Sequence, residues 1–302
     1  MAVMADLGAS ILAKLKNKAK ESDINYQQCL QLFFQEEFLR RLSKSPYANN
    51  FILKGGLFIY TLTNFNSRAT IDIDFTVRRL DNNPERMDKV IAEIIEVPTG
   101  LNDIVTLEAG KCTPIAAHRE YHGVSSQITG SIKKVRVPFC VDIGVGDVII
   151  PKPEKLVIQT QLEGYNAPKI YTYSLESTIA EKFDAILQRL ELTGRMKDFY
   201  DIYYLAQTFD FNGQRLCKAI KETLHNRKTE YSKDSFDQIR QLVDNHDIQV
   251  RWRYFQKTIN QTGLSLPDVM HLIDVFLYPV FDSLVSGEAF SKRWDAGCRE
   301  WV

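Results

Sequence analysis

The sequence predicts an α+β protein, with a mixed-sheet domain and flanking helices followed by an α-helical domain. Apolar residues recur at helical spacing in two segments within residues 5–44. Short β-branched runs separated by turn residues then fill residues 51–150. Beyond Ser174 the helical period returns. We therefore expect one domain at residues 1–172 and a second at residues 173–302.

The first segment is expected to hold two helices. Leu7, Ile11 and Leu15 recur every four residues with lysines between and after them, which is typical of a surface helix over residues 5–20. The segment "SDINYQQCLQLFFQEEFLRRLSKS" begins with a Ser-Asp capping signal and continues with apolar residues at helical spacing. It predicts a second helix that reaches Leu42.

The middle of the chain is predicted to form the sheet. Strands are expected in "FILK", "IDIDFTV", "DIVTLEA", "HGVSSQITGSI", "KKVRVPFCVDIGV" and "DVII". The segment "NPERMDKVIAEIIEV" reads as a helix with proline in its first turn. The prolines of "IPKPEK" predict a break in the sheet, and "EGYNAPKIYTYS" predicts a loop with some β character. Later segments, from "LESTIAEKFDAILQRLE" to "LPDVMHLIDVFLYPVFDSLV", predict successive helices with short connections.

The bulk composition narrows the class of protein. The 302 residues include 38 basic and 38 acidic side chains, so contact with nucleic acid would need a local patch rather than an overall field. The five cysteines are scattered without a Cys-x-x-Cys pair, which indicates reduced thiols rather than disulfides or a zinc knuckle. The N-terminus has no long apolar run. We expect a soluble, cytoplasmic protein that does not bind a membrane.

Asp72 and Asp74 stand one residue apart in a predicted strand. Successive side chains of a strand alternate between faces, so both carboxylates lie on one face. Two carboxylates so close repel each other unless a cation lies between them, which predicts a divalent-metal site. Asp142, in the apolar setting "PFCVDIGV", is the candidate third carboxylate. The alternative is an ordinary strand with polar residues on its solvent face.

Gly55 and Gly56 separate the predicted strand "NFILK" from the short apolar run "LFIYTLT". If that run is a helix, the glycines form the turn at its N-terminus, where free backbone N–H groups bind phosphate oxygens. A glycine pair by itself is more often a plain turn. Its position about sixteen residues before Asp-x-Asp favours the phosphate site.

These motifs resemble the signature of polymerase-β-type nucleotidyltransferases. The resemblance rests on Lys54-Gly55-Gly56 followed by the run from Arg68 to Phe75, "RATIDIDF". A second set narrows it to the AbiEii-type toxins of abortive-infection and type IV toxin–antitoxin systems: Ala180-Glu181-Lys182, Arg189, Lys197-Asp198, Tyr200 and Asp201. Thr70 stands where serine is common and Lys197 where arginine often precedes the aspartate, and both keep the chemical type.

The resemblance implies transfer of a nucleotide from a nucleoside triphosphate to an acceptor hydroxyl, with Mg²⁺ or Mn²⁺, in a cleft between a polymerase-β-like domain and the helical domain. Asp72 and Asp74 would hold metals that bridge the phosphates. Asp142 would hold the second metal and orient or deprotonate the hydroxyl. The residues expected to bind the nucleotide phosphates are Gly55, Gly56, Lys54, Arg68 and Thr70, although Lys54 and Arg68 fit ordinary ion pairs equally well.

In the second domain, Lys182 is expected to neutralise the leaving phosphates. The alternative is a solvated helix lysine. Glu181 points elsewhere on the helix and reads as a structural partner, for example of Arg189. Asp198 and Asp201 lie three apart and share a helix face, either as an acidic edge of the nucleotide pocket that fixes Lys182 or as an interdomain salt-bridge helix.

Two further patterns leave alternatives open. His118 and His122 lie four apart, but without a third ligand they favour strand or loop over zinc binding. Basic residues mixed with aromatics are compatible with an RNA-binding face, but a solvated helix face is the interpretation that we favour. They occur in "RWRYF" and in the series Arg215, Lys218, Lys221, His225, Arg227 and Lys228.

By resemblance, the chain is expected to be a growth-inhibiting toxin that modifies a tRNA 3′ end. A cognate antitoxin, which need not bind the toxin, would counter it. A nucleotidyltransferase acting on protein or on a small molecule would keep the same carboxylates without a basic RNA face. A non-catalytic nucleotide-binding protein would tolerate loss of a carboxylate, and the complete acidic set disfavours it.

Overall fold

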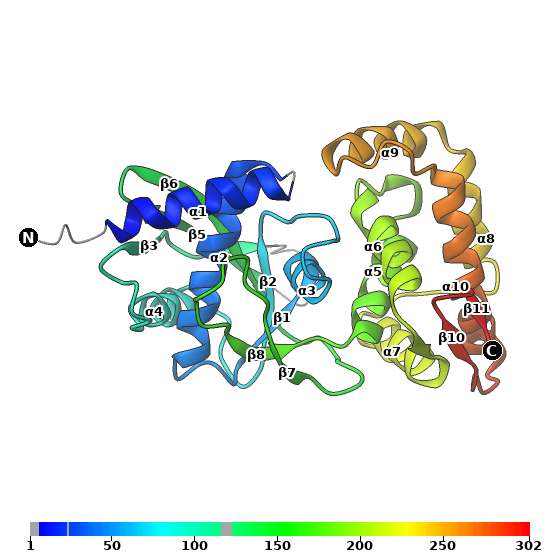
Figure 1. Cartoon of the computed structure of the whole chain (residues 1–302). Coiled ribbons are helices and arrows are strands. Elements are labelled where there is room, and N and C mark those ends of the chain that lie inside the picture. The colour runs from blue at the N-terminus through cyan, green and yellow to red at the C-terminus, as the bar shows by residue number, and fades with distance from the viewer. Residues whose placement is uncertain (1–5, 23, 116–122) are drawn as a thin grey trace, which may run out of the picture. The chain divides into compact units, whose positions relative to one another are not determined.

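The computed structural model describes residues 6–22, 24–115 and 123–302 and has the predicted α+β class. His118 and His122 lie outside the described residues. The chain divides into two compact units, which we describe separately (Figure 1). Unit 1 comprises the described residues up to Gly146 together with Glu154–Thr172, and unit 2 comprises Asp147–Pro153 and Tyr173–Val302.

Unit 1 is a mixed sheet with helices. Its strands follow the order β3-β5-β6-β2-β1-β8-β7, with β4 paired to β5. The pairs β2–β6 and β1–β8 are parallel, and the others are antiparallel. The helices are α1 (Leu7–Glu21), α2 (Tyr26–Lys44), α3 (Gly55–Leu62) and α4 (Pro84–Ile95). The strands are β1 (Phe51–Lys54), β2 (Ile73–Val77), β3 (Val105–Ala109), β4 (Thr113–Ile115), β5 (Gly123–Ile132), β6 (Val135–Gly144), β7 (Glu154–Val157) and β8 (Lys169–Thr172).

The helix α2 covers the apolar face of this sheet (Figure 1). Phe38 of α2 contacts Phe75 of β2, with ring centroids 6.3 Å apart. Gly130 of β5 allows a close approach, because a Cβ there would lie 2.7 Å from the Cβ of Phe34. Since side chains alternate along a strand, the residues between the buried ones project from the opposite face. Asp74 of β2 is one of these.

The expected strand "DVII" is wrong. Asp147–Ile150 contain no strand and belong to unit 2. The backbone of Ile150 forms hydrogen bonds with serine hydroxyls instead of with a neighbouring strand. Its N–H donates to Ser177 Oγ, and its carbonyl accepts from Ser174 Oγ. The sequence pattern is apolar enough for a strand, but serine side chains more than twenty residues along the chain bind this backbone in place of a neighbouring strand.

Charged side chains of α2 form a buried network. Glu37 accepts hydrogen bonds from Arg40 and Arg41, each at 2.9 Å, and Arg41 also donates to the carbonyl of Val105 at 2.8 Å. Glu36 accepts from the backbone N–H of Gln161 at 2.8 Å, while its nearest Arg40 nitrogen is 3.8 Å away. Burial, only partly offset by Arg40 and that hydrogen bond, raises the pKa of Glu36 to about 8.

This raised pKa predicts that unit 1 loses stability as the pH rises. The folded state keeps a proton on Glu36 up to about pH 8, whereas the unfolded chain releases it near its ordinary pKa of 4.5. The free energy of unfolding should therefore fall by at most about 1.4 kcal/mol per pH unit between these values. Glu36→Gln keeps the acceptor oxygen and should abolish this slope in pH-dependent unfolding followed by hydrogen exchange of β6. Glu108→Gln, at an exposed ion pair, is the matched control and should keep the slope.

Unit 2 is a helical bundle with a small sheet at its edge. Its helices are α5 (Leu175–Arg189), α6 (Met196–Thr208), α7 (Gly213–Asn226), α8 (Ser235–Gln241), α9 (His246–Thr258) and α10 (Leu266–Ser286), with 3-10 turns η1 (Leu190–Leu192) and η2 (Leu242–Asp244). A three-stranded sheet has the order β11-β10-β9, formed by β9 (Phe211–Asn212), β10 (Arg293–Asp295) and β11 (Glu300–Trp301). The sequence analysis did not anticipate this sheet.

The helix α10 is the central element of unit 2. It contacts α6, α7 and α8, and Phe276, Leu277 and Phe281 are completely buried. Among the described residues it is the one helix long and apolar enough to cross a membrane, and half of its apolar window is buried inside the bundle. Such a helix is equally typical of a core. Its contacts here are those of a core helix.

Candidate active site

Asp74 and Asp142 lie side by side on neighbouring parallel strands. The register of β2 and β6 pairs these two residues directly. Both project from the face opposite α2, since Phe75 and Val141 fill the apolar face. The pairing therefore brings together two of the three carboxylates that the sequence nominated.

Asp72 precedes β2, which begins at Ile73, so the strand is shorter at this end than expected. The backbone beside Asp72 is nonetheless held firmly, because the carbonyl of Ile71 accepts hydrogen bonds from the side-chain amides of Gln31 and Gln35. Burial, then the charges of Asp72 and Asp142, raise the pKa of the Cys140 thiol. The charges of Asp72 and Asp142 therefore both affect Cys140 on β6.

Ser125 of β5 positions Asp142. The two residues are opposite each other in the β5–β6 register, and the Ser125 hydroxyl donates to Asp142 Oδ1 at 2.6 Å. A hydrogen bond to the charged form of a carboxylate stabilises that form and restricts its rotation. No local pattern in the sequence indicates Ser125, because only the strand pairing connects it with Asp142.

The glycine pair begins α3 directly after β1, as predicted. Gly55 has a φ of +68°, and a Cβ there would lie 2.7 Å from Asp74 Cγ and closer still to Oδ2. A Cβ on Gly56 would lie 2.8 Å from Thr70 Oγ1 and 3.5 Å from an Arg68 guanidinium nitrogen. Lys54, the N-cap residue, makes no side-chain capping hydrogen bond. Asp74 and Thr70 therefore pack directly against the first turn of α3, at positions where only glycine leaves them room, and the N–H groups of that turn have no partner within the helix.

The donor chemistry of this site fits a hard divalent cation. Mg²⁺ binds carboxylate oxygens together with substrate phosphates rather than a complete protein cage. Asp74 and Asp142 provide such oxygens from one register position. Over residues 6–22, 24–115 and 123–302, no group of three or more His, Cys, Asp or Glu side chains is arranged around a cation site. The three-carboxylate metal site stays a prediction.

In unit 2, Lys182 forms a buried ion-pair cluster. Its Nζ lies 2.6 Å from Asp201 Oδ2 and 3.3 Å from Asp198 Oδ1. The side chain of Lys182 is only 9% exposed, so the interpretation as a solvated lysine is wrong. Although burial would raise it, the charges of Lys182 and Arg195 hold the pKa of Asp198 below its ordinary value. Asp198 and Asp201 share a helix face as predicted, and that face fixes Lys182.

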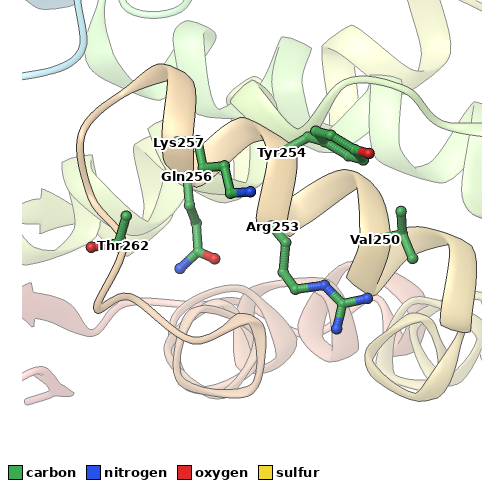
Figure 2. A pocket seen from close by; sticks show the side chains of 6 residues that line it. All are labelled: Val250, Arg253, Tyr254, Gln256, Lys257 and Thr262. Atoms are coloured by element: carbon green, nitrogen blue, oxygen red, sulfur yellow. The ribbon is translucent and has the colours of Figure 1, made fainter.

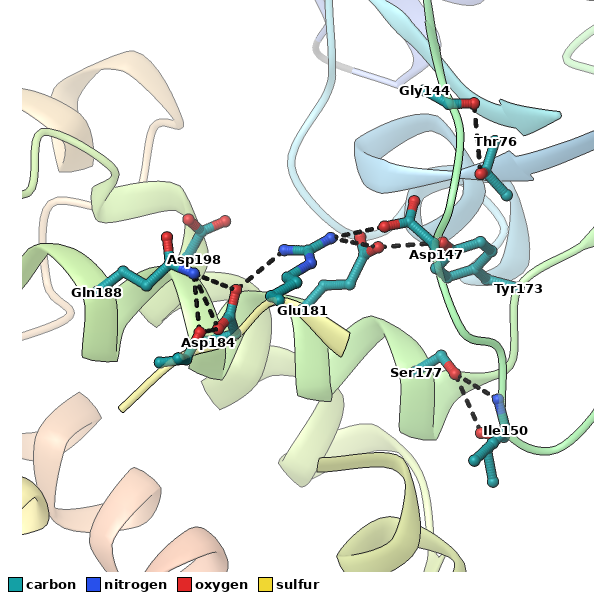
Figure 3. A network of polar contacts seen from close by, with 12 residues as sticks. Thr76, Gly144, Asp147, Ile150, Tyr173, Ser177, Glu181, Asp184, Gln188 and Asp198 are labelled. Atoms are coloured by element: carbon teal, nitrogen blue, oxygen red, sulfur yellow. Dashed lines mark hydrogen bonds and ion pairs between the residues drawn. The ribbon is translucent and has the colours of Figure 1, made fainter. Parts of the chain in front are cut away.

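A second cluster in unit 2 surrounds Arg227, and Figure 3 labels three of its members, Asp147, Glu181 and Asp184. The Arg227 guanidinium contacts Asp147 at 2.9 Å, Glu181 at 2.7 Å and Asp184 at 3.1 Å. Burial by itself would lower the pKa of Arg227, but Glu181, Asp147 and Asp184 raise it above its ordinary value. Glu181 also accepts a hydrogen bond from the Tyr173 hydroxyl at 3.0 Å. Three carboxylates thus bind the guanidinium of Arg227, so this residue differs from a cation on a solvated or RNA-binding helix face.

Residues 37–285 match the sequence family described as "Nucleotidyl transferase AbiEii toxin, Type IV TA system". The chain belongs to this family. It is thus a nucleotidyltransferase toxin of the type IV class, and the resemblance seen in the sequence is confirmed. No curated protein matches the chain.

Solved structures share the fold of this AbiEii-family protein. JHP933 from Helicobacter pylori superposes with a TM-score of 0.51 at 17% identity, covering 87% of this chain and 95% of that one. MenT4, a nucleotidyltransferase toxin from Mycobacterium tuberculosis, superposes with a TM-score of 0.51 at 14% identity, covering 92% of this chain and 99% of that one. At these identities the likeness shows the fold alone.

The other residues considered for an RNA-binding face of the AbiEii-family chain fall into two groups. Some are bound within unit 2, and others are exposed. In "RWRYF", Trp252 is buried and donates to the Leu264 carbonyl, and Arg251 donates to the Thr193 carbonyl at 2.7 Å. Only Arg253 and Tyr254 of that segment are exposed. On α7, four basic residues are exposed, namely Arg215, Lys218, Lys221 and His225. The helices α7 and α9 lie at opposite ends of unit 2 (Figure 1), so these residues form separate surfaces.

Proposed function

We propose that this toxin is a Mg²⁺-dependent enzyme that transfers nucleotides to an RNA hydroxyl, with the tRNA 3′ end as acceptor. Family membership supports the nucleotidyl transfer and the nucleoside triphosphate substrate. The observation that carries the metal and the reacting site is the pairing of Asp74 with Asp142 next to the glycine start of α3. The acceptor rests on the sequence resemblance. We further propose that the toxin acts in the cytoplasm against a cognate antitoxin that need not bind it.

The phosphates of the nucleotide are proposed to bind at the start of α3. Backbone N–H groups at a helix N-terminus attract anions, and Gly55 and Gly56 allow a phosphate oxygen to approach the backbone closely. Arg68 lies near Gly56 and would add a positive charge there. The Thr70 hydroxyl also lies next to Gly56.

Asp74, Asp142 and Asp72 are proposed to hold the metal. When bound, Mg²⁺ neutralises charge on the phosphates and makes the acceptor hydroxyl more acidic. Asp142 is our candidate to orient that hydroxyl and accept its proton, since it lies beside Asp74 and the Ser125 hydrogen bond restricts its rotation. The hydroxyl oxygen forms a bond to the α-phosphorus as the bond to pyrophosphate breaks.

Lys182 is proposed to stabilise the departing pyrophosphate. Asp198 and Asp201 would act through it, because their contacts fix the position of its ammonium group. We assign them as positioning residues rather than as groups that touch the sugar or base. Lys54 stays a candidate phosphate contact at the end of β1.

A transfer assay tests the proposed function. Purified protein is incubated with Mg²⁺, each labelled nucleoside triphosphate, and either total RNA or total protein from cells. We expect label in RNA of tRNA size, and we expect Asp74→Asn to reduce it by more than about 10²-fold because a carboxylate beside the reacting groups is lost. Asp88→Asn, on α4 away from this site, is the matched control and should retain activity.

Each rival function has its own result in this assay. Label in protein alone would show a protein-modifying nucleotidyltransferase, and label in neither pool would contradict transfer to macromolecules. Equal labelling by wild type and Asp74→Asn would remove the proposed site from the reaction. Toxicity that survives Asp74→Asn in cells would show that growth inhibition does not depend on this chemistry.

A further inference from the structure

The helix α9 carries a surface pocket that the proposed catalytic residues do not use. The pocket has a volume of about 370 Å³ and is lined by Val250, Arg253, Tyr254, Gln256, Lys257 and Thr262 (Figure 2). A volume of this size suits a ligand group such as a nucleotide. The residues that line the pocket therefore indicate the chemical class of its ligand.

The pocket wall is held in place by hydrogen bonds to the loop after α9. Trp252 is buried on the inner side of the helix and donates to the Leu264 carbonyl at 2.9 Å. Gln256 donates to the carbonyls of Gln261 and Leu264. The loop that carries Thr262 is thus fastened to α9 at two points. Because the wall is already ordered, a ligand would lose little free energy in shaping it.

The outer face of α9 combines two cations with an exposed aromatic ring. Arg253, Tyr254 and Lys257 lie within one helical turn, and Tyr254 is 68% exposed. The Lys257 ammonium lies 5.9 Å from the centre of the Tyr254 ring. Across the described part of the chain, neither Arg253 nor Lys257 forms an ion pair with a carboxylate, and no acidic residue lines the pocket. The pocket is therefore suited to an anion that also has a flat apolar face.

We propose that this pocket binds a single-stranded segment of the acceptor RNA, with one base stacked on Tyr254 and backbone phosphates at Arg253 and Lys257. Alternating phosphates and bases match cations placed beside an aromatic ring, and such stacking tolerates any base. An acidic peptide would pair with the two cations but would not stack on the Tyr254 ring. The exposed cations of α7 lack this combination, because α7 contains no Phe, Tyr or Trp. This inference rests on the proposed function only in naming RNA as the acceptor.

The test measures RNA binding by fluorescence anisotropy across a range of salt concentrations. The probe is an unstructured RNA about eight nucleotides long, and the protein is the full chain. Tyr254→Ala should weaken binding by about 10-fold without altering the salt dependence, because stacking releases no counterions. The double variant Arg253→Ala/Lys257→Ala should lower the slope of log Kd against log salt by about 1.4, since two phosphate contacts are lost.

Lys218→Ala/Lys221→Ala on α7 is the matched control, because it removes the same charge from an exposed helix. We expect it to leave affinity and slope nearly unchanged. Equal losses of RNA affinity in the two double variants would show an effect of general charge and would overturn the proposal. Unchanged RNA affinity in Tyr254→Ala would overturn it too. A polyglutamate peptide that binds this pocket, while the pocket substitutions leave RNA affinity unchanged, would assign the pocket to a protein partner. That result would also overturn the proposal.

The same variants separate this proposal from the proposed function. If wild type transfers nucleotides to RNA while Tyr254→Ala keeps the same Kd and the same KM for RNA, only the pocket assignment fails. If no RNA is modified but the variants bind RNA as expected, only the proposed function fails. Intrinsic tryptophan fluorescence checks folding of the variants, since all three tryptophans, Trp252, Trp294 and Trp301, lie in unit 2.

Discussion

Gly55→Ala is expected to reduce nucleotide transfer by more than about 10²-fold, as much as loss of Asp74 itself. The new methyl group would lie 2.7 Å from Asp74 Cγ, well inside the 3.4 Å at which ordinary contact begins. Relief requires movement of Asp74 or of the first turn of α3, and either shift displaces groups that we propose bind metal and phosphate. The measurement is the transfer assay with labelled nucleoside triphosphate.

Backbone strain needs its own control, because Gly55 has a φ of +68° and alanine in this region costs about 1–2 kcal/mol. Gly164 has a φ of +84° with no atom within 4 Å of its Cβ position. Gly164→Ala therefore introduces the strain without the collision. We expect Gly164→Ala to retain transfer activity, whereas full activity in Gly55→Ala would contradict the close packing of α3 against Asp74.

Arg227→Met is expected to destabilise unit 2 by about 3–5 kcal/mol. The substitution keeps an apolar stem but leaves Asp147, Glu181 and Asp184 close together without their cation. Urea unfolding followed by tryptophan fluorescence reports this directly, since the tryptophans belong to unit 2.

Arg293→Met is the matched control for this prediction. Arg293 pairs with Asp210 at the surface, where its side chain is 66% exposed. Exposed ion pairs contribute about 0–1 kcal/mol, so the control should change stability little. If both variants lose the same free energy of unfolding, the cluster does not stabilise unit 2 through its charges.

Much of the site could be predicted from local spacing. The glycine pair before "LFIYTLT" begins α3 as expected, and the alternation of β2 places Asp74 opposite the buried Phe75. The three-residue spacing of Asp198 and Asp201 likewise predicted a shared helix face, which the contacts with Lys182 confirm. These features depend on the periods of strand and helix, and those periods are properties of short segments.

Other features could not be read from local spacing. Arg227 looked like one of several surface cations, yet it lies among carboxylates contributed by two distant segments. The segment "DVII" has the composition of a strand, but serine side chains of α5 and its cap bind the Ile150 backbone. In each case a partner far along the chain decides the outcome, and a short window does not contain that partner.

The sequence by itself determined the α+β class, the nucleotidyltransferase toxin family and the candidate carboxylates, because motifs and periodicity are encoded in neighbouring residues. Only the tertiary structure decided that Asp74 faces Asp142 and that Ser125 holds Asp142, since register depends on pairing between distant strands. It likewise separated Arg253 and Tyr254, which line an exposed pocket, from Arg251 and Trp252, which are bound within the bundle. Adjacent residues on one helix differ in this way because packing buries one face and leaves the other in water.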